Sequence, residues 1–184
     1  MRVLPTELPG VLIVEPDVHR DTRGFFLETF HERKYAEAGI SARFVQHNHS
    51  HSSRDTLRGL HAQVRRPQGK LVRAIVGEMF DVAVDVRRGS PSFGRWVGVV
   101  LSGENYRQLW IPPGFVHGFC VLSERLHVDY KCTDFYDGSD ELAVAWNDPE
   151  IGIHWPVATP ILSDKDRAAP RLAQQLEKLP SFEP

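Results

Sequence analysis

Short apolar runs alternate with glycine- and proline-rich turns along most of the chain. The clearest run, residues 80–86, has Phe or Val at every second position, with Asp81 and Asp85 between them. This period of two is typical of a half-buried β-strand, and it places both aspartates on the face opposite the apolar side chains. Further strands are predicted at residues 10–15, 25–30, 42–48, 56–64, 70–76, 96–101, 106–111, 115–122, 126–136 and 142–146.

So many short strands, at spacings of about 8 to 12 residues, predict an all-β sandwich or barrel. A closed or double-sheet roll also removes the exposed edges that these strands would otherwise leave. The polar stretch 17–24 is predicted to be turn-like. One helix is predicted over 31–38, with Gly39 placed to end it. A C-terminal helix is predicted at about 166–179, where leucines repeat at helical spacing after Pro170.

The composition indicates a globular protein without a strong charge bias. The chain has 184 residues, of which 41% are hydrophobic, and a formal net charge of -2. This length favours a single domain, residues 1–184, and this charge argues against binding to a nucleic acid polymer. No run of roughly 18 apolar residues could span a membrane. Because the first ten residues lack a signal-peptide core and Cys120 and Cys132 are typical of buried thiols, we expect a cytoplasmic protein.

Clustered histidines raise the possibility of a metal site. His47, His49 and His51 alternate along an extended segment and so share one face, and His61 and His117 follow. Metal-binding cupins present a His-x-His pair followed by a glutamate and a later histidine. Here no glutamate follows at a fitting distance before His61, and metal ligands must converge on one point. We therefore expect no metal. His49 and His51 are more simply interpreted as surface residues.

Arg58 and His61 are polar residues in an otherwise apolar, strand-like run. Histidine is the best general base near neutral pH. The local sequence alone, however, favours a structural role for His61, as a buried histidine whose hydrogen bonds are all made within the core. Four residues elsewhere in the chain change that balance: Lys70, His117, Tyr130 and Asp166. Together these residues supply a base, a cation, an acid and a carboxylate, which are the groups needed to remove a proton beside a ketone.

A series of ordered motifs runs nearly end to end through the chain. The motifs lie at residues 21–28, 44–50, 57–63, 68–73, 77–85, 110–119, 130–131, 146–151 and 162–166. In this order they resemble the dTDP-4-dehydrorhamnose 3,5-epimerase family. The resemblance implies a cupin-like jelly roll, a double-sheet β-barrel with a few short peripheral helices that include a C-terminal one.

The resemblance also implies a reaction. The family converts dTDP-4-dehydro-6-deoxy-D-glucose to dTDP-4-dehydro-L-rhamnose by inverting carbons 3 and 5, without a metal or cofactor. By resemblance, His61 is the proton acceptor, Asp166 orients it, Tyr130 is the proton donor on the other face, and Lys70 stabilises the enolate. The product would feed dTDP-L-rhamnose biosynthesis.

Substrate binding is implied residue by residue. The resemblance assigns binding roles to Arg23, Phe26, Glu28, Gln46, His47, Asn48, Arg58, Lys70, His117, Glu141 and Lys165. Of these, Arg23 and Lys165 would contact the diphosphate, Gln46 and Asn48 the thymidine, and Phe26 could stack on the base. His47 lies between two binding positions and is expected to contribute its backbone alone.

The resemblance implies a homodimer, in which the N-terminal strands, about residues 1–50, cross to the partner and complete its site. Three alternatives stay open. The chain could invert a single carbon of a related dTDP-4-keto-deoxysugar, act as a metal-dependent cupin such as a dioxygenase, or bind sugar nucleotides without catalysis. Hydrogen exchange at both carbons, the metal content, and binding without turnover distinguish these alternatives.

Overall fold

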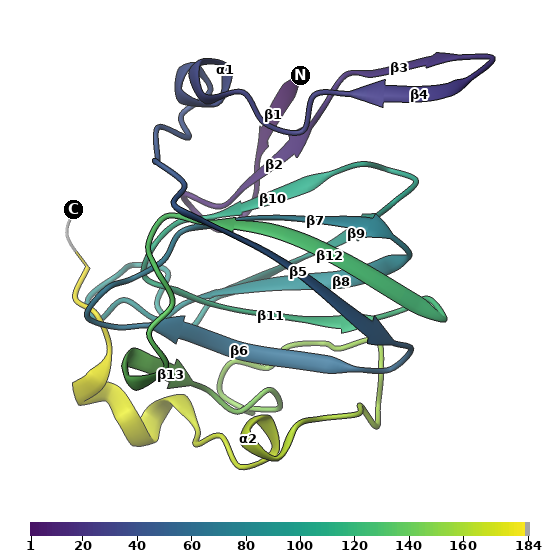
Figure 1. Cartoon of the computed structure of the whole chain (residues 1–184). Coiled ribbons are helices and arrows are strands. Elements are labelled where there is room, and N and C mark those ends of the chain that lie inside the picture. The colour runs from purple at the N-terminus through teal and green to yellow at the C-terminus, as the bar shows by residue number, and fades with distance from the viewer. Residues whose placement is uncertain (183–184) are drawn as a thin grey trace.

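Two β-sheets packed face to face form the body of the computed structural model, which describes residues 1–182 (Figure 1). The strands are β1 Arg2–Pro5, β2 Leu12–Glu15, β3 Val18–Asp21, β4 Gly24–Leu27, β5 Gln46–Ser53, β6 Leu57–Gln63, β7 Lys70–Val76, β8 Glu78–Asp85, β9 Trp96–Ser102, β10 Gln108–Ile111, β11 Phe115–Val121, β12 Arg125–Cys132 and β13 Glu141–Ala143. The larger sheet has the order β1-β2-β10-β7-β12-β5, and the smaller sheet has the order β13-β6-β11-β8-β9. Strands β3 and β4 form a separate hairpin. The prediction of an all-β, double-sheet fold is confirmed.

Apolar side chains from both sheets fill most of the space between them. Most of them come from β7 to β12, among them Val72, Met79, Leu101 and Phe119, all buried. The inner faces change character toward one end of the sheets. On β7 and β12, strand alternation puts Lys70 and Tyr130 on the same inner faces as this apolar core. The sheets therefore enclose a polar space at that end.

A different part of the chain covers part of the outer face of each sheet (Figure 1). Helix α1 (Glu32–Glu37) packs Tyr35 against the larger sheet. The C-terminal segment packs Leu172 and Leu179 against the smaller sheet. Helix α1 begins after His31 and ends before Gly39, whose φ is +92°, so the predicted first helix is confirmed.

Strand β8 departs from the predicted half-buried pattern. Asp81 and Asp85 are both 0% exposed, although the alternation of the strand suggested a polar face. The strand lies between β11 and β9, and residues beyond the strands cover Val82 and Val84 on its other side. Asp85 accepts hydrogen bonds from the hydroxyls of Ser90 and Ser92 at 2.5 and 2.7 Å. Period-two alternation therefore identified the strand, but it could not distinguish solvent from a polar interior.

The predicted C-terminal helix, about 166–179, is wrong in its extent. Two short elements replace it: α2 (Asp164–Arg167) and the 3₁₀ segment η2 (Leu172–Lys178). Pro170 lies between them. It prevents one continuous helix, because a residue that precedes a proline is disfavoured in the helical region. A non-helical φ of -140° at Gln175 interrupts η2 as well.

Residues 17–24 are also more regular than predicted, because they contain β3 and the turn into β4. Their side chains are mostly exposed, so this hairpin has no apolar alternation to reveal it. A further 3₁₀ turn, η1 (Gly138–Asp140), precedes β13. Among the described residues, no helix has the length and apolar character needed to cross a membrane. Cys120 and Cys132 are free and buried, as predicted.

Candidate active site

A cavity of 590 Å³ opens between the two sheets at their polar end. Strands β6 and β11 line it from the smaller sheet, and β5, β7 and β12 line it from the larger one. A second cavity of 320 Å³ adjoins it and shares the side chains of His61, Lys70, Tyr130 and Lys165. The predicted site residues that line one or both cavities are Gln46, Asn48, Arg58, His61, Lys70, His117, Tyr130, Glu141, Lys165 and Asp166.

Glycines on two neighbouring strands determine the position of His61. A Cβ on Gly59 would lie 2.5 Å from the Cα of Gly118, so glycine is needed for β6 to approach β11 this closely. Gly59 also has a φ of +111°, which side-chain-bearing residues rarely adopt. In the resulting register His61 pairs with His117, and both imidazoles line the larger cavity.

A buried carboxylate holds the imidazole of His61. Its Nε2 lies 2.6 Å from Oδ1 of Asp166, whose side chain is 5% exposed. Asp166 belongs to α2, and its backbone N–H donates to the capping hydroxyl of Ser163. Burial alone would raise the pKa of Asp166, but the hydrogen bond and charge of His61 outweigh burial and lower that pKa. With Nε2–H donating to an ionised Asp166, Nδ1 of His61 carries the lone pair that can accept a proton.

A second carboxylate lies near that nitrogen. Oε1 of Glu141 is 3.6 Å from Nδ1 of His61 and accepts a hydrogen bond from Nζ of Lys165 at 2.6 Å. Its Oε2 accepts a hydrogen bond from the hydroxyl of Tyr136 at 2.8 Å. Burial would raise the pKa of Glu141, but the bonds from Lys165 and Tyr136 and the charge of His61 lower it. An ionised Glu141 therefore favours the imidazolium that forms when His61 accepts a proton.

Tyr130 and Lys70 line the same cavity from the opposite sheet. They project from adjacent strands, on which Lys70 pairs with Cys132. Burial raises the pKa of Tyr130 above its ordinary value of 10.0, so the phenol keeps its proton at neutral pH. Burial lowers the pKa of Lys70, and Cys132, Asp81 and Glu141 partly offset this effect. The wall opposite His61 thus presents a proton donor beside an amine.

Arg58 and His117 add two polar groups to the larger cavity. Nε2 of His117 lies 2.6 Å from Oδ1 of Asp81, whose Oδ2 has no hydrogen-bond partner within residues 1–182. The guanidinium of Arg58 donates to Oγ of Ser52 at 2.9 Å and to the backbone oxygen of His51 at 3.1 Å. These bonds hold the guanidinium at the cavity wall, where its fixed charge suits an anionic ligand.

Strand β5 presents alternate residues to two different faces. Gln46 and Asn48 line the smaller cavity, and Nε2 of Gln46 donates to Oδ1 of Asn48 at 3.0 Å. His47 lies between them on the outer face, where its Nε2 is 2.5 Å from Oδ1 of Asp129. The side chain of His47 is 52% exposed, so it lies outside the cavity.

The histidines that suggested a metal site do not gather around His61. His49 and His51 share the outer face of β5 with His47, and Nε2 of His49 lies 3.0 Å from Nδ1 of His127. Within the described part of the chain, no group of three or more His, Cys, Asp or Glu side chains is arranged to hold a metal ion.

Arg23, Phe26 and Glu28 lie away from both cavities. They belong to the β3–β4 hairpin or follow it directly, and the hairpin projects from the body of the molecule (Figure 1). The side chain of Arg23 is 88% exposed and pairs with Asp21, and Phe26 is 70% exposed. Glu28 accepts a hydrogen bond from Lys34 at 2.9 Å. Within one chain, these three predicted binding residues are separate from the site.

Five residues that line the smaller cavity were not predicted as site residues from the sequence: Ala62, Gln63, Gln68, Cys132 and Tyr136. Tyr136 is 58% exposed and follows Phe135 in the polar loop between β12 and β13. An exposed aromatic pair in such a loop is a signal for binding that could have identified Tyr136. Cys132 has no comparable signal, because its sequence context is that of a buried strand residue, which it also is.

The arrangement can move protons on two faces of one bound molecule. A base oriented by a carboxylate lies on one sheet, and a protonated phenol lies on the other. The amine of Lys70 beside the phenol can stabilise the oxyanion that forms when a proton is removed next to a carbonyl group. Arg58 and Lys165 provide positive charge suited to phosphate groups.

Comparisons with known proteins extend over nearly the whole chain. The family model described as dTDP-4-dehydrorhamnose 3,5-epimerase matches residues 5–174. A Shigella flexneri protein of that name is 56% identical over 168 residues, covering 90% of this chain and 93% of the relative. A Neisseria gonorrhoeae protein of the same name is 54% identical over 175 residues, covering 95% of this chain, which spans about half of that relative (53%).

A solved structure is similar in both fold and sequence. It is the crystal structure of a dTDP-6-deoxy-D-glucose-3,5-epimerase from Legionella pneumophila in complex with dTDP-4-keto-L-rhamnose. Its TM-score to this chain is 0.97 at 49% sequence identity, and the match covers 100% of this chain and 99% of that one.

Proposed function

The chain belongs to the dTDP-4-dehydrorhamnose 3,5-epimerase family, and from this membership we propose how its residues carry out the reaction. It is an isomerase that converts dTDP-4-dehydro-6-deoxy-D-glucose to dTDP-4-dehydro-L-rhamnose, a step of dTDP-L-rhamnose biosynthesis. The keto group at carbon 4 acidifies the C–H bonds at carbons 3 and 5. The reaction therefore consists of proton transfers, for which we expect neither a metal nor a redox cofactor.

In the first step His61 removes the proton from carbon 3 or carbon 5. The C–H electron pair forms the enolate double bond, and the carbonyl electron pair moves onto the oxygen at carbon 4. Lys70 stabilises that oxygen by charge and hydrogen bonding. Asp166 holds the imidazole, and both Asp166 and Glu141 stabilise the resulting imidazolium.

In the second step Tyr130 gives its hydroxyl proton to the opposite face of the same carbon. The enolate collapses to the ketone with that centre inverted, and Tyr130 is left as a phenolate. The imidazolium then loses its proton and the phenolate regains one, both through solvent. The same two residues repeat these steps at the other carbon once the ring is re-presented to them.

Each part of the substrate is assigned to the cavity side chains whose charge or hydrogen-bonding groups suit it. Arg58, His117 and Lys165 contact the sugar and its diphosphate. Gln46 and Asn48, with the backbone at position 47, contact the thymidine from the smaller cavity.

We further propose that the chain is a single epimerase domain that acts as a homodimer, in which the hairpin of one subunit completes the site of the other. The exposed Arg23, Phe26 and the nearby Glu28 support this arrangement, because their own chain does not place them at its cavity. Arg23 would bind the partner's diphosphate ligand, and Phe26 and Glu28 would contact its thymidine. The two free, buried thiols fit a reducing location, which we take to be the cytoplasm.

One observation supports the mechanism most strongly: a base fixed by a 2.6 Å bond to Asp166 shares a cavity with a protonated Tyr130 from the opposite sheet. Proton NMR of the reaction in deuterium oxide tests the proposal. We expect deuterium at both carbon 3 and carbon 5, with both centres inverted. Exchange and inversion at a single carbon would refute it.

A further inference from the structure

We propose that Gln63 is a positioning residue for substrate binding, because its buried amide holds the loop at residues 133–140 against the smaller cavity. Gln63 is 3% exposed and follows His61 by two residues on β6. The inference rests on the proposed function, since this loop borders the cavity that is proposed to bind the nucleotide sugar.

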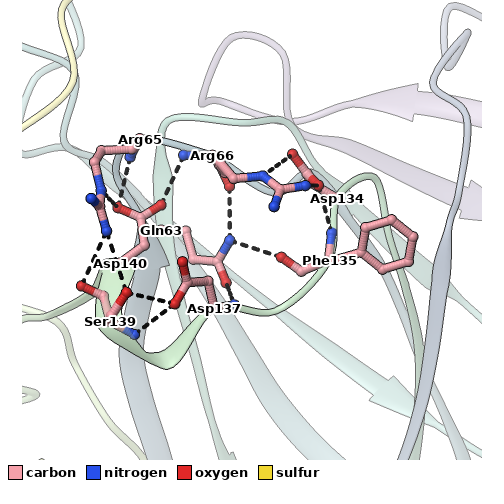
Figure 2. Close-up of polar contacts among 8 residues, drawn as sticks. All are labelled: Gln63, Arg65, Arg66, Asp134, Phe135, Asp137, Ser139 and Asp140. Carbon is pink, nitrogen blue, oxygen red and sulfur yellow. Dashed lines mark hydrogen bonds and ion pairs between the residues drawn. The ribbon is translucent and has the colours of Figure 1, made fainter.

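The amide of Gln63 joins two loops through three hydrogen bonds (Figure 2). Its Nε2 donates to the backbone oxygens of Arg66 at 2.9 Å and Phe135 at 3.2 Å. Its Oε1 accepts a hydrogen bond from the backbone N–H of Asp137 at 2.7 Å. Both amide hydrogens and the oxygen are used. A buried amide of this kind fixes its partners, because losing any bond leaves a buried polar group unpaired.

Asp140 provides a second anchor between the same loops (Figure 2). Its carboxylate accepts hydrogen bonds from the backbone N–H groups of Arg65 and Arg66 at 2.9 and 2.8 Å, and from Nε of Arg65 at 3.1 Å. Asp140 is itself buried, at 6% exposed. A third link, the ion pair between Arg66 and Asp134, is open to solvent, with side chains 51% and 31% exposed. The buried groups therefore hold the loop, and the exposed pair adds little.

Through Tyr136 the loop contacts two residues that line the smaller cavity, Gln46 and Glu141. The backbone N–H of Tyr136 donates to Oε1 of Gln46 at 2.8 Å, and the Tyr136 hydroxyl donates to Oε2 of Glu141. Glu141 in turn pairs with Gln63 across β13 and β6. Gln46 is proposed to contact the thymidine, and the family resemblance assigns Glu141 a binding role, so both residues lose a hydrogen bond if the loop moves away from Gln63.

Loss of the Gln63 amide should therefore weaken binding more than chemistry. The groups that transfer protons lie on β6, β12 and α2, and these elements keep their own backbone hydrogen bonds. A residue needed for general folding would instead lower stability without separating KM from kcat.

The test uses Gln63→Glu, which keeps the shape but removes the donor, and Gln63→Leu, which removes all three bonds. For each full-length variant, kcat and KM are measured with dTDP-4-dehydro-6-deoxy-D-glucose, and Kd with dTDP by calorimetry. We expect KM and Kd to rise about tenfold while kcat stays within about threefold.

Arg66→Gln is the matched control, because it removes the exposed ion pair but keeps the backbone oxygen that Gln63 binds. KM should stay within about twofold of the wild type, as expected for an exposed ion pair. Unchanged KM and Kd in both Gln63 variants would overturn the inference, and so would a loss confined to kcat.

Hydrogen exchange of the wild-type protein gives a test that needs no variant to fold. The amide of Asp137, bound to Gln63, should exchange slowly in the free protein. Exchange at the rate of an unprotected amide would overturn the inference. A wild type that inverts neither carbon refutes the proposed function instead, so the two failures are distinguishable.

Discussion

The wall that carries His61 and the β3–β4 hairpin contain similar ion pairs in opposite surroundings. At the wall, Asp166 lies 2.6 Å from His61, and the two side chains are 5% and 26% exposed. On the hairpin, Asp21 lies 2.5 Å from Arg23, and the side chains are 50% and 88% exposed. The first pair is fixed by packing, a helix cap and a neighbouring carboxylate. The second pair is open to solvent on a projecting hairpin (Figure 1).

From this difference we infer which groups one chain completes by itself and which it leaves for a second chain. The chemistry of the site is assembled within one subunit, from two sheets and α2. The hairpin exposes two adjacent aromatic side chains, Phe25 at 55% and Phe26 at 70%. Neighbouring apolar side chains that are this exposed are typical of a surface that binds another protein. We infer that the hairpin is built for contact with a second subunit.

The largest effect is expected from His61→Ala, which removes the base. Turnover should fall about 10³-fold or more, because the imidazole that Asp166 orients as the base is lost. Binding of dTDP, measured by calorimetry, should stay within about threefold, since the base touches the sugar end. Turnover within tenfold of wild type would show that the wall does not supply the base.

Tyr130→Phe should have the next largest effect and should separate two events that the wild type couples. Inversion should fall about 10²-fold, because the donor on the second face is lost. His61 can still remove a proton and return one to the same face. NMR in deuterium oxide should therefore show exchange outpacing inversion, whereas equal losses of both would contradict the assigned role.

Arg23→Ala on the hairpin should have a moderate effect. Losing one charged hydrogen bond to a diphosphate corresponds to a decrease in kcat/KM of about 10- to 30-fold. Calorimetry with dTDP should show the same loss, because the contact precedes chemistry. Arg20→Ala, on the same hairpin, is the control and should leave dTDP affinity unchanged. Wild-type affinity in the Arg23 variant would mean that the hairpin does not reach a site.

The smallest effect is a pH dependence of stability. The pKa of Asp166 is lowered from its ordinary value of 3.8, so its carboxylate stabilises the fold above that pH. This stabilisation is lost as the pH falls through the lowered folded-state pKa. Asp166→Asn should reduce the free energy of unfolding by about 1 kcal/mol at pH 7, and the difference from wild type should shrink below pH 3.8.

Asp21→Asn is the matched control for that measurement. The hydrogen bond from Arg23 also lowers the pKa of Asp21, but solvent screens this exposed pair. Denaturant unfolding at several pH values should show no difference between this variant and the wild type. A pH-dependent difference as large as that of Asp166→Asn would contradict the contrast between the two regions.

Much of the fold could be predicted because alternation marks strands directly. The bounds of β7 are those predicted, 70–76, and α1 lies within its predicted range. The wrong predictions of burial have a common cause: the alternation shows which side chains are polar, but it does not show whether they face solvent or a polar interior. Asp81 was assigned to a polar face and lies buried against His117. Strand β1, short and at a sheet edge, carried too little pattern to be recognised.

The candidate site could not be assembled from local sequence. His61 and Asp166 are separated by 105 positions, and no periodicity brings them together. The ordered motifs of a known family selected both residues, and the structure places them in contact. Tyr136 and Gln63 were not assigned roles, because their importance depends on hydrogen bonds between two loops distant in sequence.

Mixing two impaired variants tests most directly whether the site is completed across subunits. His61→Ala and Arg23→Ala chains are unfolded together, refolded at equal amounts and assayed for turnover. If the hairpin serves its partner, each mixed dimer has one intact site, and roughly a quarter of wild-type activity should return. If activity stays at the average of the two separate variants, the hairpin does not complete a partner's site and the account is wrong.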